Sequence, residues 1–169
     1  MKYILPTLLL NISSTISCTS IKQISVQAPL DANSLVYLDT YTIPNNFQFM
    51  QTTVGGLSSI DYDVKKNHYY LISDDRSAIN PARFYTATIA IKNNKIDTVA
   101  FISRSFLQDN NGKTYPSTKT DPTQTPDPES MRYHPGLNHL VWSSEGERSI
   151  RPKESILSHP AVYVRETSG

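Results

Sequence analysis

Two stretches of the chain decide its fold because they repeat each other: GLSSIDYDVKKNHYYLISDDR at residues 56–76 and DPESMRYHPGLNHLVWSSEGER at residues 127–148. They align without a gap, at an offset of 130 − 59 = 71 residues. At this offset a Tyr, an Asn, a His and a Ser each meet their own kind, and Asp74 meets Glu145. Repetition at a fixed spacing is typical of proteins built from copies of one supersecondary unit.

Each copy predicts a series of short strands. Residues 60–62 and 131–133 alternate between apolar and polar side chains, which favours a strand. A polar turn follows, and then an apolar, partly aromatic strand that ends in Ser and a group of acidic residues. The further strands that we expect lie at 83–89 and 161–165 as third strands, at 96–105 as the fourth strand of the first copy, and at 34–43 before both copies.

Four consecutive strands joined by turns are the unit of a β-propeller blade. The long repeat is explained by residues 106–126, which are rich in Pro, Asp, Asn and Thr and are expected to form a loop. A β-sandwich is the competing interpretation, but it does not predict units that end in the same acidic chemistry. The predicted fold class is all-β, an incomplete β-propeller of about two to three blades, and a closed propeller needs at least about four. We therefore expect the chain to be the N-terminal part of a longer protein.

Composition excludes several classes of protein. The chain has 169 residues, of which 38% are hydrophobic and 18% charged, so it is neither a multi-span membrane protein nor a highly charged disordered chain. The net charge of +1 argues against general electrostatic binding of nucleic acid. A single cysteine excludes an internal disulfide framework and a Cys-rich zinc site.

Residues 1–18 have the pattern of an export signal of the lipoprotein type. Lys2 is followed by an apolar run at 4–12 that is too short to span a bilayer, which takes about 20 residues. Small residues lead to Cys18, which resembles the lipid-attachment cysteine of bacterial lipoproteins. The alternatives are an ordinary secretory signal or a buried free cysteine. We expect a linker at 19–33, a propeller domain at 34–169, and a periplasmic or surface protein anchored by lipid to the bacterial outer membrane.

Several motifs taken together resemble the phytase-like domain family, also described as having esterase-like activity of phytase. They are GGLSSIDYD at 55–63, SDDR at 73–76, NPARFY at 80–85, DPESMRY at 127–133 and WSSEGE at 142–147. The resemblance runs from about residue 55 to 169 and implies a propeller from an exported bacterial protein longer than this chain. The sequence departs from the family pattern at Ser59, where Gly is expected, and at Glu147, where Asp is expected. The family's C-terminal half, with a further acidic motif, has no counterpart here.

The acidic strand ends are the candidate site, because corresponding strand ends of successive blades meet around one mouth. The candidate catalytic residues are Asp74, Asp75, Arg76, Glu145, Glu147 and Arg148, and the candidate metal ligands are Asp74, Asp75, Glu129, Glu145 and Glu147. Ligands that offer only oxygen suit Ca²⁺. Bound calcium would hold a phosphate ester and help to activate water, and arginine would contact phosphate oxygens. The expected partner is a small phosphate or carboxylate ester, with membrane contact through the lipid anchor only.

The same residues admit a structural interpretation. Asp and Glu at strand ends commonly accept backbone N–H groups in turns, and each acidic group here has an arginine beside it. His68 and His139 recur in equivalent turns, which favours packing over ligation. No G-x-S-x-G motif surrounds Ser58 and Ser59, so a Ser-His-Asp mechanism is not favoured. The functions left open are a metal-assisted phosphoester hydrolase, a non-catalytic surface propeller that binds sugar, peptide or protein, and a structural blade segment.

Overall fold

The computed structural model describes residues 36–150 and 155–167. Contacts divide the chain into Met1–Val36 and Tyr37–Gly169, and every described strand belongs to the second unit. The expected signal at 1–18 with Cys18 and the expected linker at 19–33 lie outside the described residues. The described part contains no helix, and hence no helical segment able to cross a bilayer.

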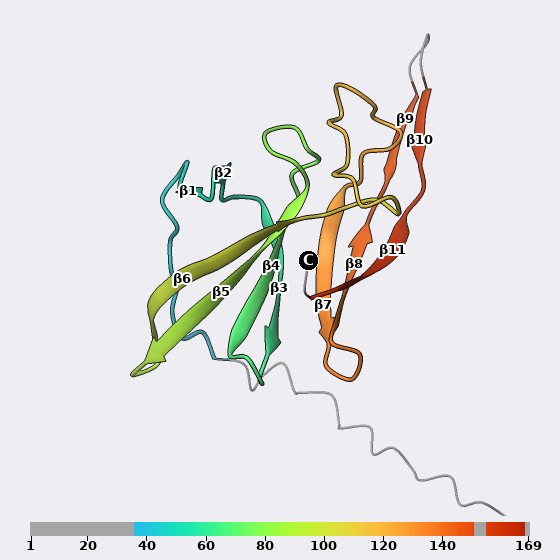
Figure 1. Ribbon diagram of the computed structural model, residues 1–169. Helices are drawn as coiled ribbons and strands as arrows, with labels where there is room; N and C mark the ends of the chain where they lie inside the picture. Colours follow the sequence, from blue (N-terminus) through green and yellow to red (C-terminus); the bar gives the residue numbers. More distant parts are fainter. Residues whose placement is uncertain (1–35, 151–154, 168–169) are drawn as a thin grey trace, which may run out of the picture. The chain divides into compact units, whose positions relative to one another are not determined.

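Two antiparallel sheets form the body of the molecule (Figure 1). Blade 1 consists, in chain order, of β3 (Leu57–Asp63), β4 (His68–Ser73), β5 (Arg83–Lys92) and β6 (Lys95–Phe106). Blade 2 consists of β7 (Pro128–His134), β8 (His139–Ser144) and β11 (Ala161–Glu166), with β8 in the middle. The predicted all-β class and the predicted strands in these regions are confirmed.

The repeat extends to the backbone of the first two strands of each blade. β3 has a β-bulge between Leu57 and Ser59, and β7 has one at the equivalent place, between Pro128 and Ser130. A bulge locally shifts the pairing and bends the strand. Both blades therefore bend at the point where the chain approaches the acidic strand ends.

The turns at the other end of the blades are also built alike. Asn67 and Asn138 adopt φ values of 54° and 53°, a left-handed conformation that Asn tolerates better than most residues. In each turn the Asn side-chain oxygen accepts a hydrogen bond from a tyrosine hydroxyl, Tyr62 at 2.8 Å and Tyr133 at 3.1 Å. The conserved spacing of Tyr and Asn in the two copies thus has one local cause, which is this turn.

The core lies between the two blades. Tyr70, Ile72 and Phe84 of blade 1 face the second sheet, and Met131 and Trp142 of blade 2 pack against them. Each of these side chains is at most 3% exposed. Burial of a large apolar side chain contributes about 1.5–3 kcal/mol, so this interface holds the blades together.

Polar side chains join the innermost strands, β3 and β7. The Met131 N–H donates to the Ser59 hydroxyl oxygen at 3.0 Å, and the same hydroxyl donates to the Met131 carbonyl at 3.1 Å. The Tyr133 N–H donates to the Asp61 carboxylate at 2.7 Å. Ser59 and Asp61 therefore link the two inner strands by hydrogen bonds.

The segment before blade 1 covers that blade's other face. It contains the two-residue strands β1 (Gln48–Phe49) and β2 (Thr52–Thr53), which pair with each other. Phe49 packs against Tyr85 and Phe101, with ring centroids 6.5 and 5.7 Å apart. The strand expected over 34–43 is wrong for residues 36–43, which the structure describes without strand. Residues 36–43 pair with no strand in the described part of the chain, and they are tied to blade 1 by a hydrogen bond from the Ile96 N–H to the Asp39 carboxylate.

The sequence interpretation missed one hairpin. Strands β9 (Glu147–Ile150) and β10 (Ser155–Ser158) pair with each other between β8 and β11. Gly146 (φ 75°) makes the entry possible, because a Cβ there would overlap the Ser158 carbonyl oxygen. The described residues thus comprise two blades, this hairpin and the short β1–β2 pair, and they form no closed ring.

Candidate metal site at the strand ends

The acidic ends of the two repeat copies meet on one side of the molecule, at the top of Figure 1. Arg76 follows β4 of blade 1, and its Nη2 donates to the Glu147 carboxylate at 2.5 Å. The Arg76 Nε also lies 3.5 Å from the Asp127 carboxylate. These contacts confirm the prediction that the charged ends of the two copies point the same way.

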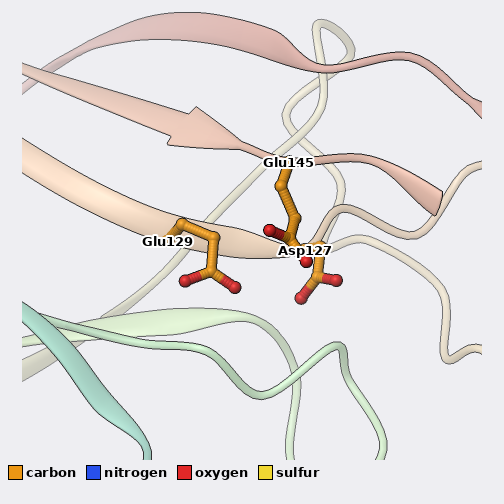
Figure 2. Close-up of side chains that lie close together, drawn as sticks. All are labelled: Asp127, Glu129 and Glu145. Atoms are coloured by element: carbon orange, nitrogen blue, oxygen red, sulfur yellow. The ribbon is translucent and has the colours of Figure 1, made fainter.

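Three carboxylates gather where blade 2 begins and where β8 ends. Asp127, Glu129 and Glu145 each offer an oxygen, and these oxygens lie within 4.8 Å of one another. Figure 2 shows the three side chains turned toward a common space. We call these three residues the acidic cluster.

Backbone bonds place the acidic cluster. The Glu145 N–H donates to the Asp127 carbonyl at 3.1 Å, and the Asp127 N–H donates to the Ser144 hydroxyl at 2.9 Å. Glu129 sits within the β-bulge of β7. In blade 1 the Asp74 N–H makes the equivalent bond to the Gly56 carbonyl, at 2.8 Å. The repeat therefore builds the same strand end twice, but only the second copy carries carboxylates at all three positions.

The electrostatics of the cluster favour a bound cation. Burial raises the pKa of Asp127; Arg76 opposes this rise, while Glu145, Asp74 and Glu147 add to it. Burial also raises the pKa of Glu129, together with the charges of Glu145, Asp127 and Asp74. A raised carboxyl pKa means that the negative form is destabilised in the folded protein. A cation placed among these groups would relieve that cost.

The donor set fits calcium. Calcium takes oxygen ligands at about 2.3–2.6 Å, so ligand atoms on opposite sides of the ion lie about 5 Å apart. The 4.8 Å limit within the cluster agrees with this spacing, and all three side chains offer oxygen alone. Asp127, Glu129 and Glu145 would hold the ion.

Asp74 lies close to the cluster but outside it. Its carboxylate is exposed, and its charge contributes to the raised pKa of both Asp127 and Glu129. Gly56, at φ 56°, leaves the room that Asp74 needs, because a Cβ on Gly56 would overlap the Asp74 carboxylate. Glu147 is engaged with Arg76, and its charge also adds to the raised pKa of Asp127.

Asp75 and Arg148 are not brought to the cluster. The Asp75 carboxylate accepts a hydrogen bond from Arg83 Nη1 at 2.8 Å and further ones from the N–H groups of Ala78, Ile79 and Asn80. Burial alone would raise the pKa of Asp75, but these hydrogen bonds outweigh it and lower the pKa. Arg148 is exposed in β9, opposite Leu157.

A pocket of about 1060 Å³ adjoins the cluster. Asp74, Arg76 and Glu147 belong to its wall, and the loop residues 118–120 lie in it as well. The acidic cluster itself is not part of this wall, and Arg76 connects the two, since it contacts Asp127 and lines the pocket. Arg76 is therefore the side chain through which a molecule in the pocket and the cluster would be linked.

The family model described as Phytase-like, esterase-like activity of phytase, matches residues 52–166. The chain belongs to the phytase-like family. No curated protein and no solved structure matches it. The phytase-like fold is a β-propeller, and its members are often calcium-dependent. The match includes both blades, the acidic cluster and the pocket wall from Thr53 onward, while the wall residues 43–46 precede it.

Sequence reasoning missed one member of this phytase-like site, Asp127. It occupies the repeat position of Gly56, which carries no ligand atom, and the candidate ligands named from the sequence did not include it. The signal that could have identified it is the larger number of acidic residues in the second copy. Positions 127, 129 and 145 carry three carboxylates, where the first copy has Gly, Ser and Asp.

Proposed function

We propose that this phytase-like protein is a metal-assisted phosphoester hydrolase whose calcium is held by Asp127, Glu129 and Glu145. The observation that carries the proposal is the convergence of three carboxylate oxygens within 4.8 Å, beside a pocket large enough for a small ester. Bound calcium supplies charge stabilisation for phosphoryl oxygens and lowers the pKa of coordinated water.

Two side chains of the protein would bind the phosphate and accept the proton. Arg76 stands between the cluster and the pocket, and its guanidinium is oriented by Glu147 and Asp127. A guanidinium held in this way can offer its remaining N–H groups to a phosphate oxygen. Asp74, exposed on the pocket wall, is the carboxylate best placed to accept a proton from an attacking water.

Turnover with and without calcium tests the proposal. We expect phosphate release from p-nitrophenyl phosphate in calcium and its loss in excess chelator, because the acidic cluster alone offers no electrophile. p-Nitrophenyl acetate serves as the carboxylate-ester substrate, and Ser58→Ala as the control for a serine mechanism. Activity that persists in chelator and disappears with Ser58→Ala would show that the mechanism is wrong.

The second candidate function is a non-catalytic surface propeller that binds a sugar, peptide or protein. It is favoured by Arg76 and Arg83 on the pocket wall, which are both paired with carboxylates as a structural role requires. Calcium binding measured by calorimetry, without turnover of any phosphate or carboxylate ester, would favour this candidate over the hydrolase.

We also propose that the protein is exported and anchored by lipid on Cys18, on the sequence of residues 1–18 alone. Expression in a bacterial host with a radioactive fatty acid is expected to label the wild-type protein and place it in the membrane fraction. Cys18→Ala should remove both the label and the membrane association. Label retained in that variant would contradict lipid attachment at this residue.

A further inference from the structure

We infer that the pocket beside the acidic cluster takes a phosphomonoester with one phosphate group and an uncharged body, and that Lys119 is the side chain that recognises its phosphate. This inference rests on the proposed function. It depends on which charged side chains of the pocket wall already have an ion-pair partner.

Most of the pocket's charges are paired. Its described wall has three acidic side chains and three basic ones. Asp75 and Arg83 form a buried pair at 2.8 Å, and Arg76 is bound to Glu147 at 2.5 Å. Asp74 and Lys119 are the charged side chains of the described wall that belong to neither pair.

Among the described residues of the pocket wall, Lys119 is the cation available to a ligand. It is exposed on the loop between β6 and β7 and lines the pocket. None of the ion pairs found among residues 36–148 and 155–167 includes it. An ammonium group on a flexible stem is a common partner for a phosphate.

The charge available suits a single phosphate. A phosphate monoester carries about −1.5 to −2 at pH 7, so six of them on one molecule carry about −9 to −12. One calcium ion and Lys119 together supply three positive charges, which already face the three carboxylates of the cluster and Asp74, so the site has no positive charge to spare for further phosphates. A polyphosphorylated substrate therefore fits this pocket poorly.

The rest of the wall suits an uncharged body. Amide and hydroxyl side chains line it at Asn45, Asn46, Thr53, Thr118 and Thr120. Apolar side chains lie among them, including Ile79, which is 72% exposed, and Ile156 from β10. Groups of these two kinds hydrogen-bond to and pack against a neutral ester, and none of them supplies charge for more phosphates.

The test compares two substrates and two lysine variants in calcium. We expect a higher kcat/KM for p-nitrophenyl phosphate than for inositol hexakisphosphate. Lys119→Ala should raise KM for p-nitrophenyl phosphate about three- to tenfold with kcat unchanged, which is the effect of losing one exposed charged hydrogen bond. Lys113→Ala is the matched control, because Lys113 is exposed on the same loop but does not line the pocket.

The outcomes separate the inference from the proposed function. Preference for the hexakisphosphate, or equal kinetics for the two lysine variants, would overturn the inference and leave the hydrolase intact. If neither substrate turns over, the hydrolase proposal fails, and calorimetry with phenyl phosphate in calcium decides the inference. Saturable binding that Lys119→Ala weakens and Lys113→Ala does not would support it, and absence of binding would refute it.

Discussion

Replacing Asp75 with alanine is expected to lower the free energy of unfolding by about 3–5 kcal/mol, the usual cost of removing one partner of a buried ion pair. The side chains of Arg83 and Asp75 are 2% and 8% exposed, so the variant would leave a buried guanidinium without its counter-ion. The change also deprives three loop N–H groups of their acceptor. Urea unfolding monitored by the fluorescence of Trp142 would measure it.

Asp74→Ala is the matched control for this variant. Asp74 is the preceding residue, but its carboxylate is exposed and lies near other negative charges. We expect its removal to leave the free energy of unfolding unchanged or slightly higher. Equal destabilisation by the two variants would contradict the structural role of Asp75. Asp75→Asn, which keeps the shape of the side chain, should fall between wild type and Asp75→Ala.

The stability that the Asp75–Arg83 pair contributes also depends on pH, and the sign of this dependence follows from the lowered pKa of Asp75. Its hydrogen bonds hold the pKa of Asp75 below the ordinary value, so the unfolded chain binds a proton more readily than the folded one. The stability that the pair contributes is therefore present above the unfolded pKa of about 3.9 and is lost as the pH falls through the folded pKa. The difference in stability between wild type and Asp75→Asn should shrink in this acidic range.

Glu129→Gln is expected to reduce the free energy of unfolding that calcium adds to the protein. In wild type, calcium at 100 times its dissociation constant should add about 2.7 kcal/mol to the free energy of unfolding. Loss of one ligand should weaken binding by about a hundredfold, the upper range seen when groups around a metal site are removed. At the same calcium concentration the added stability then falls to about 0.4 kcal/mol.

Without calcium the same variant should be more stable than wild type. Burial and the nearby carboxylates raise the pKa of Glu129, so its negative charge costs stability once the pH rises through the folded pKa. Glutamine keeps the size of the side chain and removes the charge. By the same linkage, calcium binding to wild type should weaken as the pH falls through the raised pKa values of Glu129 and Asp127, since protons compete with the ion.

Glu166→Gln is the control for a charge change away from the cluster, because Glu166 is exposed on β11. It should leave the calcium response as in wild type. Destabilisation by Glu129→Gln in chelator, or an undiminished calcium response in this variant, would contradict a cation site at the acidic cluster.

The repeat was enough to predict the strands of the two blades and the shared side of their charged ends. The turns of each copy are held by hydrogen bonds between residues close in sequence. Examples are the bonds from the Tyr62 hydroxyl to Asn67 and from the Tyr133 hydroxyl to Asn138. A pattern that occurs twice therefore predicts the same local structure twice. The expectation that Glu129 and Glu145 belong to one region follows from the same logic, because β7 and β8 are paired neighbours.

Only the tertiary structure decided which of the acidic residues meet. Asp74 and Asp75 are adjacent and chemically alike, yet the first lies near the cluster and the second is buried against Arg83. Asp127 joins the site although its counterpart in the first copy is a glycine, and Glu147 reaches Arg76 because β9 and β10 form a hairpin that the repeat does not contain. These outcomes depend on side-chain direction and on the packing of two sheets, which involve residues about 70 positions apart in sequence, and no local pattern specifies them.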